Sequence, residues 1–399
     1  MRMLYVLLIC TLTCLLLSGC WDARELNQRA VIGAIGIDAD DQPDRYEVSI
    51  QVVIADEIAG AKGRGTTPVV LYSEEGDTIM EALRRIARKV PRQISLAHVR
   101  TVVISEDLAR KSIADFIDFL ERDPETRITM DMMIARGEKA KDVLKTMTSV
   151  GRIPANDITD KMEVSERQLG ENYTTPIDAV IRGLLVKGGG PVVSGIAVEG
   201  DLKEASGKSN VESIEPKATL LANGMAIFRD SRLAGWMDGE EAIGLSMINN
   251  KVKSTVTSLS CGRKREGVII STYYIKSRVK AEFVNGKPVM HIYVKEKGSV
   301  GESNCALALR DSKVLDSLQR SWAEKTVEIL KATVHAAQEA NTDVLDFGQA
   351  IARGHSREWK KLSKEWPQLF PELDVQYHVN AFLVHTESRN NPYNRVQQE

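Results

Sequence analysis

Apolar and polar positions follow two different periods along the chain. From residue 29 to about residue 150, strand-like runs such as 30–37 and the period-two segment 45–54 alternate with helix-period segments. Thr78-x-x-Glu81 is a capping box, in which each side chain satisfies a free backbone N–H at a helix start. The other expected elements are strands over 94–104 and 127–135 and helices over 108–120 and 139–148. Strands and helices mix without the regular alternation of a doubly wound sheet, which predicts an α+β fold.

The hydrophobic periodicity weakens between residues 151 and 216. A helix over 173–186 and a short strand over 192–198 are expected there, and the run Gly188-Gly189-Gly190-Pro191 separates them. The polar stretch 201–213 is typical of a loop or a domain boundary. We therefore expect a small middle domain or insert between two larger parts.

The part from residue 217 to about residue 385 has the clearest pattern. Asn285-Gly286 is the strongest short turn signal of the chain and predicts a β-hairpin. The expected elements are a hairpin of strands 218–228 and 233–237, a helix over 239–249, hairpin strands 272–284 and 287–294, a long helix over 312–341 and a strand over 375–384. The chain is thus predicted to be a multidomain α+β protein with mixed or antiparallel sheets and packed helices.

The first twenty residues have the pattern of an export signal. Met1 and Arg2 precede the uncharged stretch 3–17, which is shorter than the ~20 apolar residues of a membrane-spanning helix. This length fits a secretory signal peptide, and Leu17-Ser18-Gly19-Cys20 resembles the lipobox of bacterial lipoproteins. We expect cleavage before Cys20 and a diacylglycerol on its sulfur, which would hold the protein on a membrane surface. The alternative is an uncleaved anchor with an incidental cysteine, which the small residues before Cys20 disfavour.

A chain of 399 residues is too long for one ordinary core and long enough for two or three domains. The expected division is a signal peptide over 1–19, an N-terminal domain over 20–150, a middle domain over 151–216, a C-terminal domain over 217–387 and a polar tail over 388–399. The net charge of −2 provides no global field that would recruit nucleic acid.

Cysteine is scarce outside the signal. After Cys20, the sequence contains only Cys261 and Cys305, so the fold is not built on disulfides. These two flank the hairpin signal at Asn285-Gly286 but do not fall in register across it. Two buried thiols are therefore favoured, and a disulfide stays open as the alternative. A zinc site is disfavoured because no Cys-x-x-Cys is present.

The sequence contains no recognisable catalytic or cofactor-binding motif. The glycine cluster 60–65 opens no expected helix, and Gly188-Gly189-Gly190 lacks the Lys-Ser/Thr of a phosphate-binding loop. The six histidines are scattered singly, and neither His-Glu-x-x-His nor Gly-x-Ser-x-Gly is present. We expect a protein that is not an enzyme and that holds no cofactor and no metal.

Several segments together resemble the Ger(x)C family of spore germination lipoproteins. The densest match is Gly224-Met-Ala-Ile-Phe228, followed by Leu233-x-Gly235-Trp236-Met237 and then Glu240-Glu241. The other matching segments are Gly19-Cys20-Trp21-Asp22 with Glu25-Leu26, Gly36-Ile37-Asp38, Thr78 to Leu83, His98 to Ile104, Arg122 to Glu125, Asp346-Phe347-Gly348, Trp359-Lys360 and Trp366 to Pro371. They span almost the whole chain after the signal.

This resemblance implies the C subunit of a nutrient germinant receptor. It also implies three α+β domains on the outer face of the inner spore membrane. The implied partners are an A subunit and a transporter-like B subunit, and whether this subunit itself binds nutrient stays open. A solute-binding lipoprotein of a transporter is the alternative function, and it would need two similar lobes around a ligand cleft.

The densest matching segment supplies the candidate site residues. Phe228, Leu233 and Trp236 are expected to form a packed hairpin corner, and Glu240 and Glu241 to begin the next helix near its positive end. These side chains are interpreted as structural or as contacts to a partner. Packing alone explains the residue types, and a contact to the A or B subunit is the sharper hypothesis.

Overall fold

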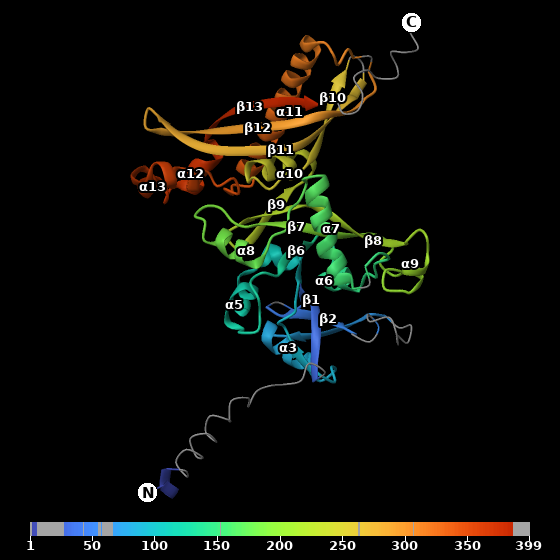
Figure 1. Ribbon diagram of the computed structural model, residues 1–399. Coiled ribbons are helices and arrows are strands. Elements are labelled where there is room, and N and C mark those ends of the chain that lie inside the picture. Colours follow the sequence, from blue (N-terminus) through green and yellow to red (C-terminus); the bar gives the residue numbers. More distant parts are fainter. Residues whose placement is uncertain are drawn as a thin grey trace.

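The computed structural model describes residues 2–5, 28–42, 44–54, 57, 67–151, 153–261, 264–305 and 307–385. Cys20, most of the predicted signal peptide and the tail 388–399 lie outside this part. The molecule is elongated, with two β-sheets one beyond the other along its length (Figure 1). Among the residues described, no helix is both long and apolar enough to cross a membrane. The protein has the α+β fold that the sequence predicts.

The first sheet is mixed. Its hydrogen-bonded order is β3-β2-β1-β5-β6-β7-β8-β9, and β4 also pairs with β1. The neighbours β1, β5, β6 and β7 run parallel, while antiparallel strands extend both sides. The strands are β1 Arg29–Ala39, β2 Tyr46–Val53, β3 Val69–Gly76, β4 Gln93–Ser95, β5 Thr101–Ser105, β6 Asp131–Ala135, β7 Val192–Gly200, β8 Ala218–Arg229 and β9 Arg232–Met237.

Helices cover both faces of this sheet. The helices are α3 Ile79–Ile86, α4 Glu106–Lys111, α5 Ala114–Arg122, α6 Ala140–Lys145, α7 Pro154–Gln168, α8 Ile177–Leu184 and α9 Ser209–Glu212. One apolar core lies between the sheet and α3, α5 and α8, and a second lies between the sheet and α6 and α7. Burial on both faces explains why the central strands are almost continuously apolar.

The capping box at α3 is present in a slightly different form from the one expected. The Glu81 backbone N–H donates to Thr78 Oγ1 at 3.1 Å, as predicted. The Glu81 carboxylate accepts from the backbone N–H of Asp77 at 3.0 Å instead of that of Thr78. The hydrogen bond to the Glu81 carboxylate therefore comes from one residue earlier than expected. Both side chains of the capping box still accept a hydrogen bond from a backbone N–H at the helix start.

The first sheet continues through the segment in which a separate middle domain is expected. Helices α7 and α8 and strand β7 belong to 151–216, and β7 pairs with both β6 and β8. The expected boundaries near residues 150 and 216 thus fall within one hydrogen-bonded sheet, and the division into three domains stays a prediction.

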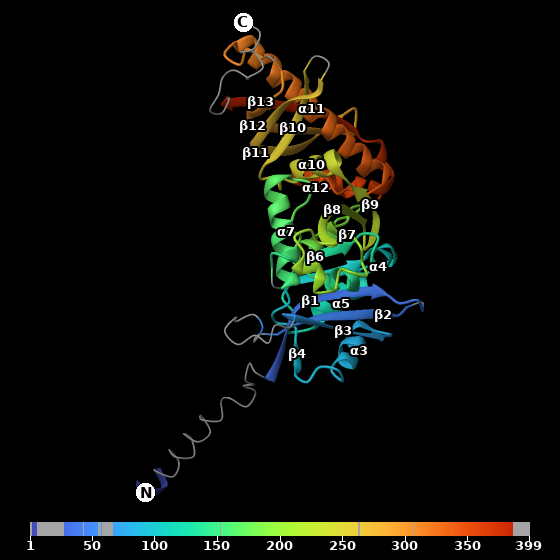
Figure 2. The same ribbon diagram turned by 90° about the vertical axis from the view of Figure 1, so that its right-hand side faces the viewer.

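The second sheet has the order β10-β11-β12-β13, with β13 parallel to β12. The predicted hairpin at Asn285-Gly286 is confirmed, and both residues have positive φ, at 51° and 78°. The elements are α10 Gly239–Ile248, β10 Thr255–Cys261, β11 Lys264–Val284, β12 Lys287–Ser303, α11 Ser312–Glu339, α12 Phe347–Gly354, α13 Ser356–Leu362, α14 Trp366–Leu369, the 3-10 helix Phe370–Glu372 and β13 Asp374–His385. Helices α10 and α11 pack on one face of this sheet (Figure 2).

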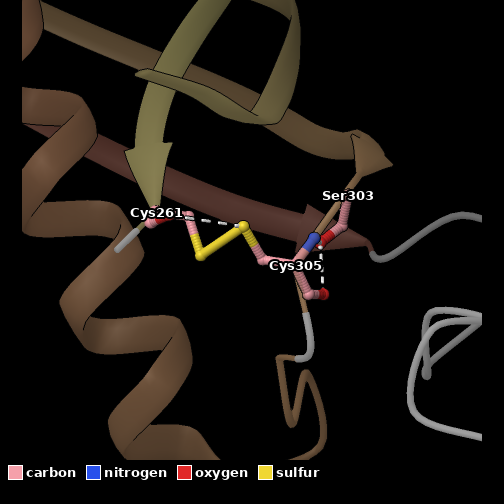
Figure 3. The surroundings of a disulfide bond; sticks show 3 residues. All are labelled: Cys261, Ser303 and Cys305. Atoms are coloured by element: carbon pink, nitrogen blue, oxygen red, sulfur yellow. Dashed lines mark hydrogen bonds between the residues drawn. A yellow bond between two sulfur atoms is a disulfide. The ribbon is translucent and has the colours of Figure 1, made fainter. Parts of the chain in front are cut away.

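The favoured interpretation of Cys261 and Cys305 as buried thiols is wrong. The two residues form a disulfide with their Cα atoms 6.5 Å apart, and both are only half-buried (Figure 3). Cys261 is the last residue of β10, a strand that the sequence did not predict. The register of the β11–β12 hairpin therefore does not determine whether these two cysteines meet. The bridge crosses the backbone of β11 at Gly267, where a Cβ would lie 2.6 Å from Cys305 Sγ.

Candidate functional site

The predicted site residues lie at the end of the first sheet, where it meets the C-terminal half. Phe228 on β8 and Leu233 on β9 are buried in the core that α3, α5 and α8 cover. Trp236 is only half-buried against that core, and Glu240 is exposed on α10. The structure therefore places the four residues in three different environments.

Trp236 is the centre of a polar cluster. Its indole Nε1 donates to Glu106 Oε1 at 3.0 Å, and the guanidinium carbon of Arg136 lies 4.4 Å from the ring centroid. The indole ring also lies against Gly195 of β7, where a Cβ would come within 2.5 Å of it. A cation over an indole face and a charge-assisted hydrogen bond to its edge hold the ring in one orientation.

Arg136 connects this cluster to the start of α10. Its two terminal nitrogens donate to the two carboxylate oxygens of Asp238, at 2.5 and 2.8 Å. A further hydrogen bond of 3.0 Å runs from Arg136 Nη1 to Asn223 Oδ1. Asp238 is the N-cap residue of α10, so the bidentate pair fixes that helix against β6. We name Trp236, Arg136, Glu106 and Asp238 the tryptophan cluster.

The backbone conformation and close contacts at residue 224 explain why the densest matching segment begins with glycine. Its φ is +69°, a conformation that L side chains rarely adopt. A Cβ at this position would overlap Asp238 Oδ1 and lie 2.9 Å from Arg136 Nη1. The glycine is therefore needed for the strand to pass close to the Arg136–Asp238 pair.

Glu106 is held as a carboxylate. Partial burial alone would raise its pKa, but hydrogen bonds from the Trp236 indole, a guanidinium and the Gly137 backbone N–H together lower the pKa below its ordinary value. The hydrogen bonds that Arg136 donates to the Asp238 carboxylate raise the pKa of Arg136 and so keep it charged. The cluster thus stays ionic at neutral pH.

Glu240 links the two helices, α10 and α11, that pack on the second sheet. Its carboxylate accepts from Lys325 Nζ of α11 at 2.8 and 2.9 Å. One turn further, Gly244 lies so close to Thr333 of α11 that an added Cβ would overlap the Thr333 hydroxyl. The neighbouring Glu241 is half-buried, and burial raises its pKa. Glu240 and Glu241 do begin the helix, but their contacts are with α11.

A groove of about 1060 Å³ opens beside the tryptophan cluster, between α7 and β8. Arg136, Asn223, Gly224 and Asp238 form one end of it. Large apolar side chains are exposed along its walls, namely Val150, Val164, Leu169 and Leu221. A wall of exposed apolar side chains next to a rigid ionic cluster is typical of a protein contact surface.

The described residues bring together no group of three His, Cys, Asp or Glu side chains that could hold a metal ion. The carboxylates of the tryptophan cluster are already engaged by arginine and tryptophan. The arrangement is therefore suited to rigid docking, and the expected lack of metal, cofactor and catalysis stays a prediction.

Sequence reasoning missed Glu106 and Arg136. Each directly follows a buried parallel strand, since β5 ends at Ser105 and β6 ends at Ala135. The carboxyl ends of adjacent parallel strands meet at one sheet edge, where functional side chains commonly gather. Charged residues directly after two buried runs were thus an available signal.

Comparison with known proteins identifies the class to which this fold and cluster belong. A model of the spore germination protein N-terminal domain matches residues 22–198, and a model described as spore germination B3/GerAC like, C-terminal, matches residues 223–387. Spore germination protein KC of Bacillus subtilis (strain 168) is 31% identical over 388 residues, which cover 96% of this chain and 95% of that protein. The chain belongs to the Ger(x)C family of spore germination proteins.

Two further similarities agree with this assignment. Spore germination protein B3 of Bacillus subtilis (strain 168) is 24% identical over 375 residues, covering 93% of this chain and 94% of that protein. The crystal structure of the GerBC protein matches with a TM-score of 0.55 and 21% identity, covering 91% of this chain and all of that one. The structural match supports the fold.

Proposed function

We propose that this chain is a lipid-anchored, non-enzymatic subunit of a nutrient germinant receptor. The observation that carries the proposal is the match of both family domains, in order, over nearly the whole chain. In this role it works with membrane-embedded A and B subunits on the outer face of the inner spore membrane. The groove beside the tryptophan cluster is the surface that we assign to a partner subunit.

The anchor is tested at Cys20. Replacing it with alanine removes the sulfur that takes the diacylglycerol, so lipidation and processing are expected to fail. No protein of mature size should appear in the detergent phase when the variant is fractionated. Spores that carry the variant should not germinate in response to nutrients. Cys10→Ala is the matched control, because it also replaces one cysteine of the predicted signal peptide and leaves the acylated position unchanged. A Cys20 variant of mature size in the detergent phase that supports germination would refute the anchor.

Assembly is tested by co-expression with the A and B subunits and purification through a tag on the B subunit. The wild-type chain should be recovered with both in detergent. Leu221→Asp in the groove should abolish its recovery, while Ile214→Asp, at another exposed apolar position, should not. Recovery of the Leu221 variant at wild-type level would place the contact elsewhere, and failure of the wild-type chain to co-purify would overturn the receptor role.

The alternative function, a solute-binding lipoprotein, makes a different prediction. It needs two similar lobes around a cleft, whereas the two sheets described here differ in size and topology. We expect the mature chain with Cys20→Ala to give no tight, saturable heat in calorimetric titrations with amino acids, sugars, nucleotides or divalent metals. A one-to-one heat with an amino acid or a sugar would revive the solute-binding function.

A further inference from the structure

One face of the second sheet carries no covering helix among the residues described. Side chains alternate across its strands, and Met290, Ile292 and Val294 point into the core against α10 and α11. The residues between them point to the opposite, open face. Its central residues are Tyr274, Lys276, Arg278 and Lys280 of β11, His291, Tyr293, Lys295 and Lys297 of β12, and Gln376, His378, Asn380 and Phe382 of β13. We name this set the basic face.

The basic face holds five lysine and arginine side chains and no carboxylate. None of the five forms an ion pair within the part of the chain that the structure describes. Lys276 and Lys295 lie directly opposite each other across β11 and β12, and like charges in such a pair are destabilising. Two carboxylates, Glu282 of β11 and Asp374 of β13, follow this set on the same face at its hairpin end, where Glu282 pairs with His291 at 3.2 Å. A chain of net charge −2 therefore concentrates positive charge here at a cost to its own stability.

Aromatic rings lie between the cations. Three lysine ammonium groups each lie 5.5 to 5.7 Å from the centroid of a different aromatic ring on the same face. They belong to Lys280, Lys295 and Lys297. The rings involved are those of Tyr274, Tyr293 and Phe382, each about two-fifths exposed. Lysine together with aromatic side chains is the combination that proteins place at the headgroup level of membranes.

We propose that the basic face binds the anionic phospholipid headgroups of the membrane on which the protein is held. This inference rests on the proposed function, because the Cys20 anchor keeps the face near that surface. The segment between Cys20 and β1 is about nine residues, or at most about 30 Å of extended chain. Attachment at one end alone does not fix the orientation of an elongated molecule, and a second contact at its far end would fix it.

The size of the effect follows from charge alone. Each lysine or arginine near an anionic leaflet strengthens binding by about fivefold. The potential of the surface decays within about 10 Å, so only side chains that lie on the membrane contribute. A lipid anchor and a basic patch together are a known pair of signals for stable attachment. The protein would lie on its side, with the open face of the second sheet toward the lipid.

The test uses the mature chain, residues 20–399, with Cys20→Ala so that no acyl chain contributes. Co-sedimentation is measured with vesicles of two parts phosphatidylcholine to one part phosphatidylglycerol, and with pure phosphatidylcholine. The triple variant Lys276→Gln, Arg278→Gln, Lys295→Gln should bind the anionic vesicles about 100-fold more weakly. The control triple Lys360→Gln, Lys361→Gln, Lys364→Gln makes the same charge change at exposed positions near α13 and should bind as the parent chain does.

Each other outcome overturns the inference. It fails if the parent chain does not bind the anionic vesicles, if it binds phosphatidylcholine equally, or if the control triple weakens binding as much. Tighter binding of a single-stranded oligonucleotide would make this a nucleic-acid surface. The melting temperature of the triple variant of the basic face should not fall, because the substitutions remove the repulsion between Lys276 and Lys295. Since no acyl chain is present, these results are independent of whether Cys20 is lipidated.

Discussion

Replacing Trp236 with alanine is expected to lower the free energy of unfolding by about 2–3 kcal/mol. A fully buried tryptophan would cost about 3–5 kcal/mol, but this ring is only half-buried. The alanine variant also leaves Glu106 without the indole hydrogen bond and Arg136 without its ring. Trp236→Phe keeps a ring under the guanidinium but loses the N–H donor and part of the ring area, so about 1–2 kcal/mol is expected. Urea denaturation measures both variants.

Leu221→Ala is the control for the stability measurement only, since Leu221 lies in the groove that we assign to a partner subunit. Leu221 lies in the neighbouring strand β8 and is exposed, so its truncation should change the unfolding free energy by less than about 1 kcal/mol. If Trp236→Ala melts like the parent chain but no longer co-purifies with the A and B subunits, the tryptophan is a partner contact and its packing role is refuted. Loss of stability with intact assembly would refute the partner contact instead.

The tryptophan cluster shows how far the sequence could lead. The segment from Gly224 to Glu241 is continuous in the chain, and its hairpin and helix follow from local pattern. Glu106 and Arg136 join it from more than 100 residues away, through hydrogen bonds to Trp236 and Asp238. Local periodicity contains no information about which strands become neighbours, so the sequence identified one side of the cluster and not the other.

The fold was predictable wherever one apolar stripe determined an element. Helix α7 was missed because its buried side contains few apolar residues. The main ones are Ala155, Ile158 and Met162, which are too few to produce a clear helical period. The expected strand 94–104 is two strands, because β4 and β5 pair with separate parts of β1. Leu96 and Val99 in the intervening loop are buried, so the apolar pattern runs on through the break.

One buried acid was also missed, although the alternation of its strand points to it. Glu296 on β12 lies between two lysines of the basic face and must therefore point into the core. Its side chain is fully buried, and Thr326 Oγ1 of α11 donates to its Oε1 at 2.8 Å. Its other carboxylate oxygen has no hydrogen-bond partner in the described structure. Desolvation outweighs the single hydrogen bond and raises the pKa of Glu296 to about 8.

This carboxyl should make the protein less stable as the pH rises. Below its ordinary pKa of 4.5, Glu296 is protonated in both the folded and the unfolded chain, and its full contribution to stability is present. Between 4.5 and about 8 only the unfolded chain releases the proton, so the free energy of unfolding falls by about 1.4 kcal/mol per pH unit. Burial raises the pKa of Asp38, Asp131 and Asp343 to about 6, so their contributions lie at lower pH.

The window between pH 6 and pH 8 therefore isolates Glu296, and the expected loss across it is about 2–3 kcal/mol. Glu296→Gln keeps the shape of the side chain without an ionisable group, so its unfolding free energy should stay nearly level over that window. At pH 8 the glutamine variant should thus be the more stable protein. Glu324→Gln, at an exposed position of α11, should retain the slope of the parent chain. An unchanged slope in Glu296→Gln would mean that the carboxyl ionises inside the folded protein, which would require a second donor or water between α11 and the sheet.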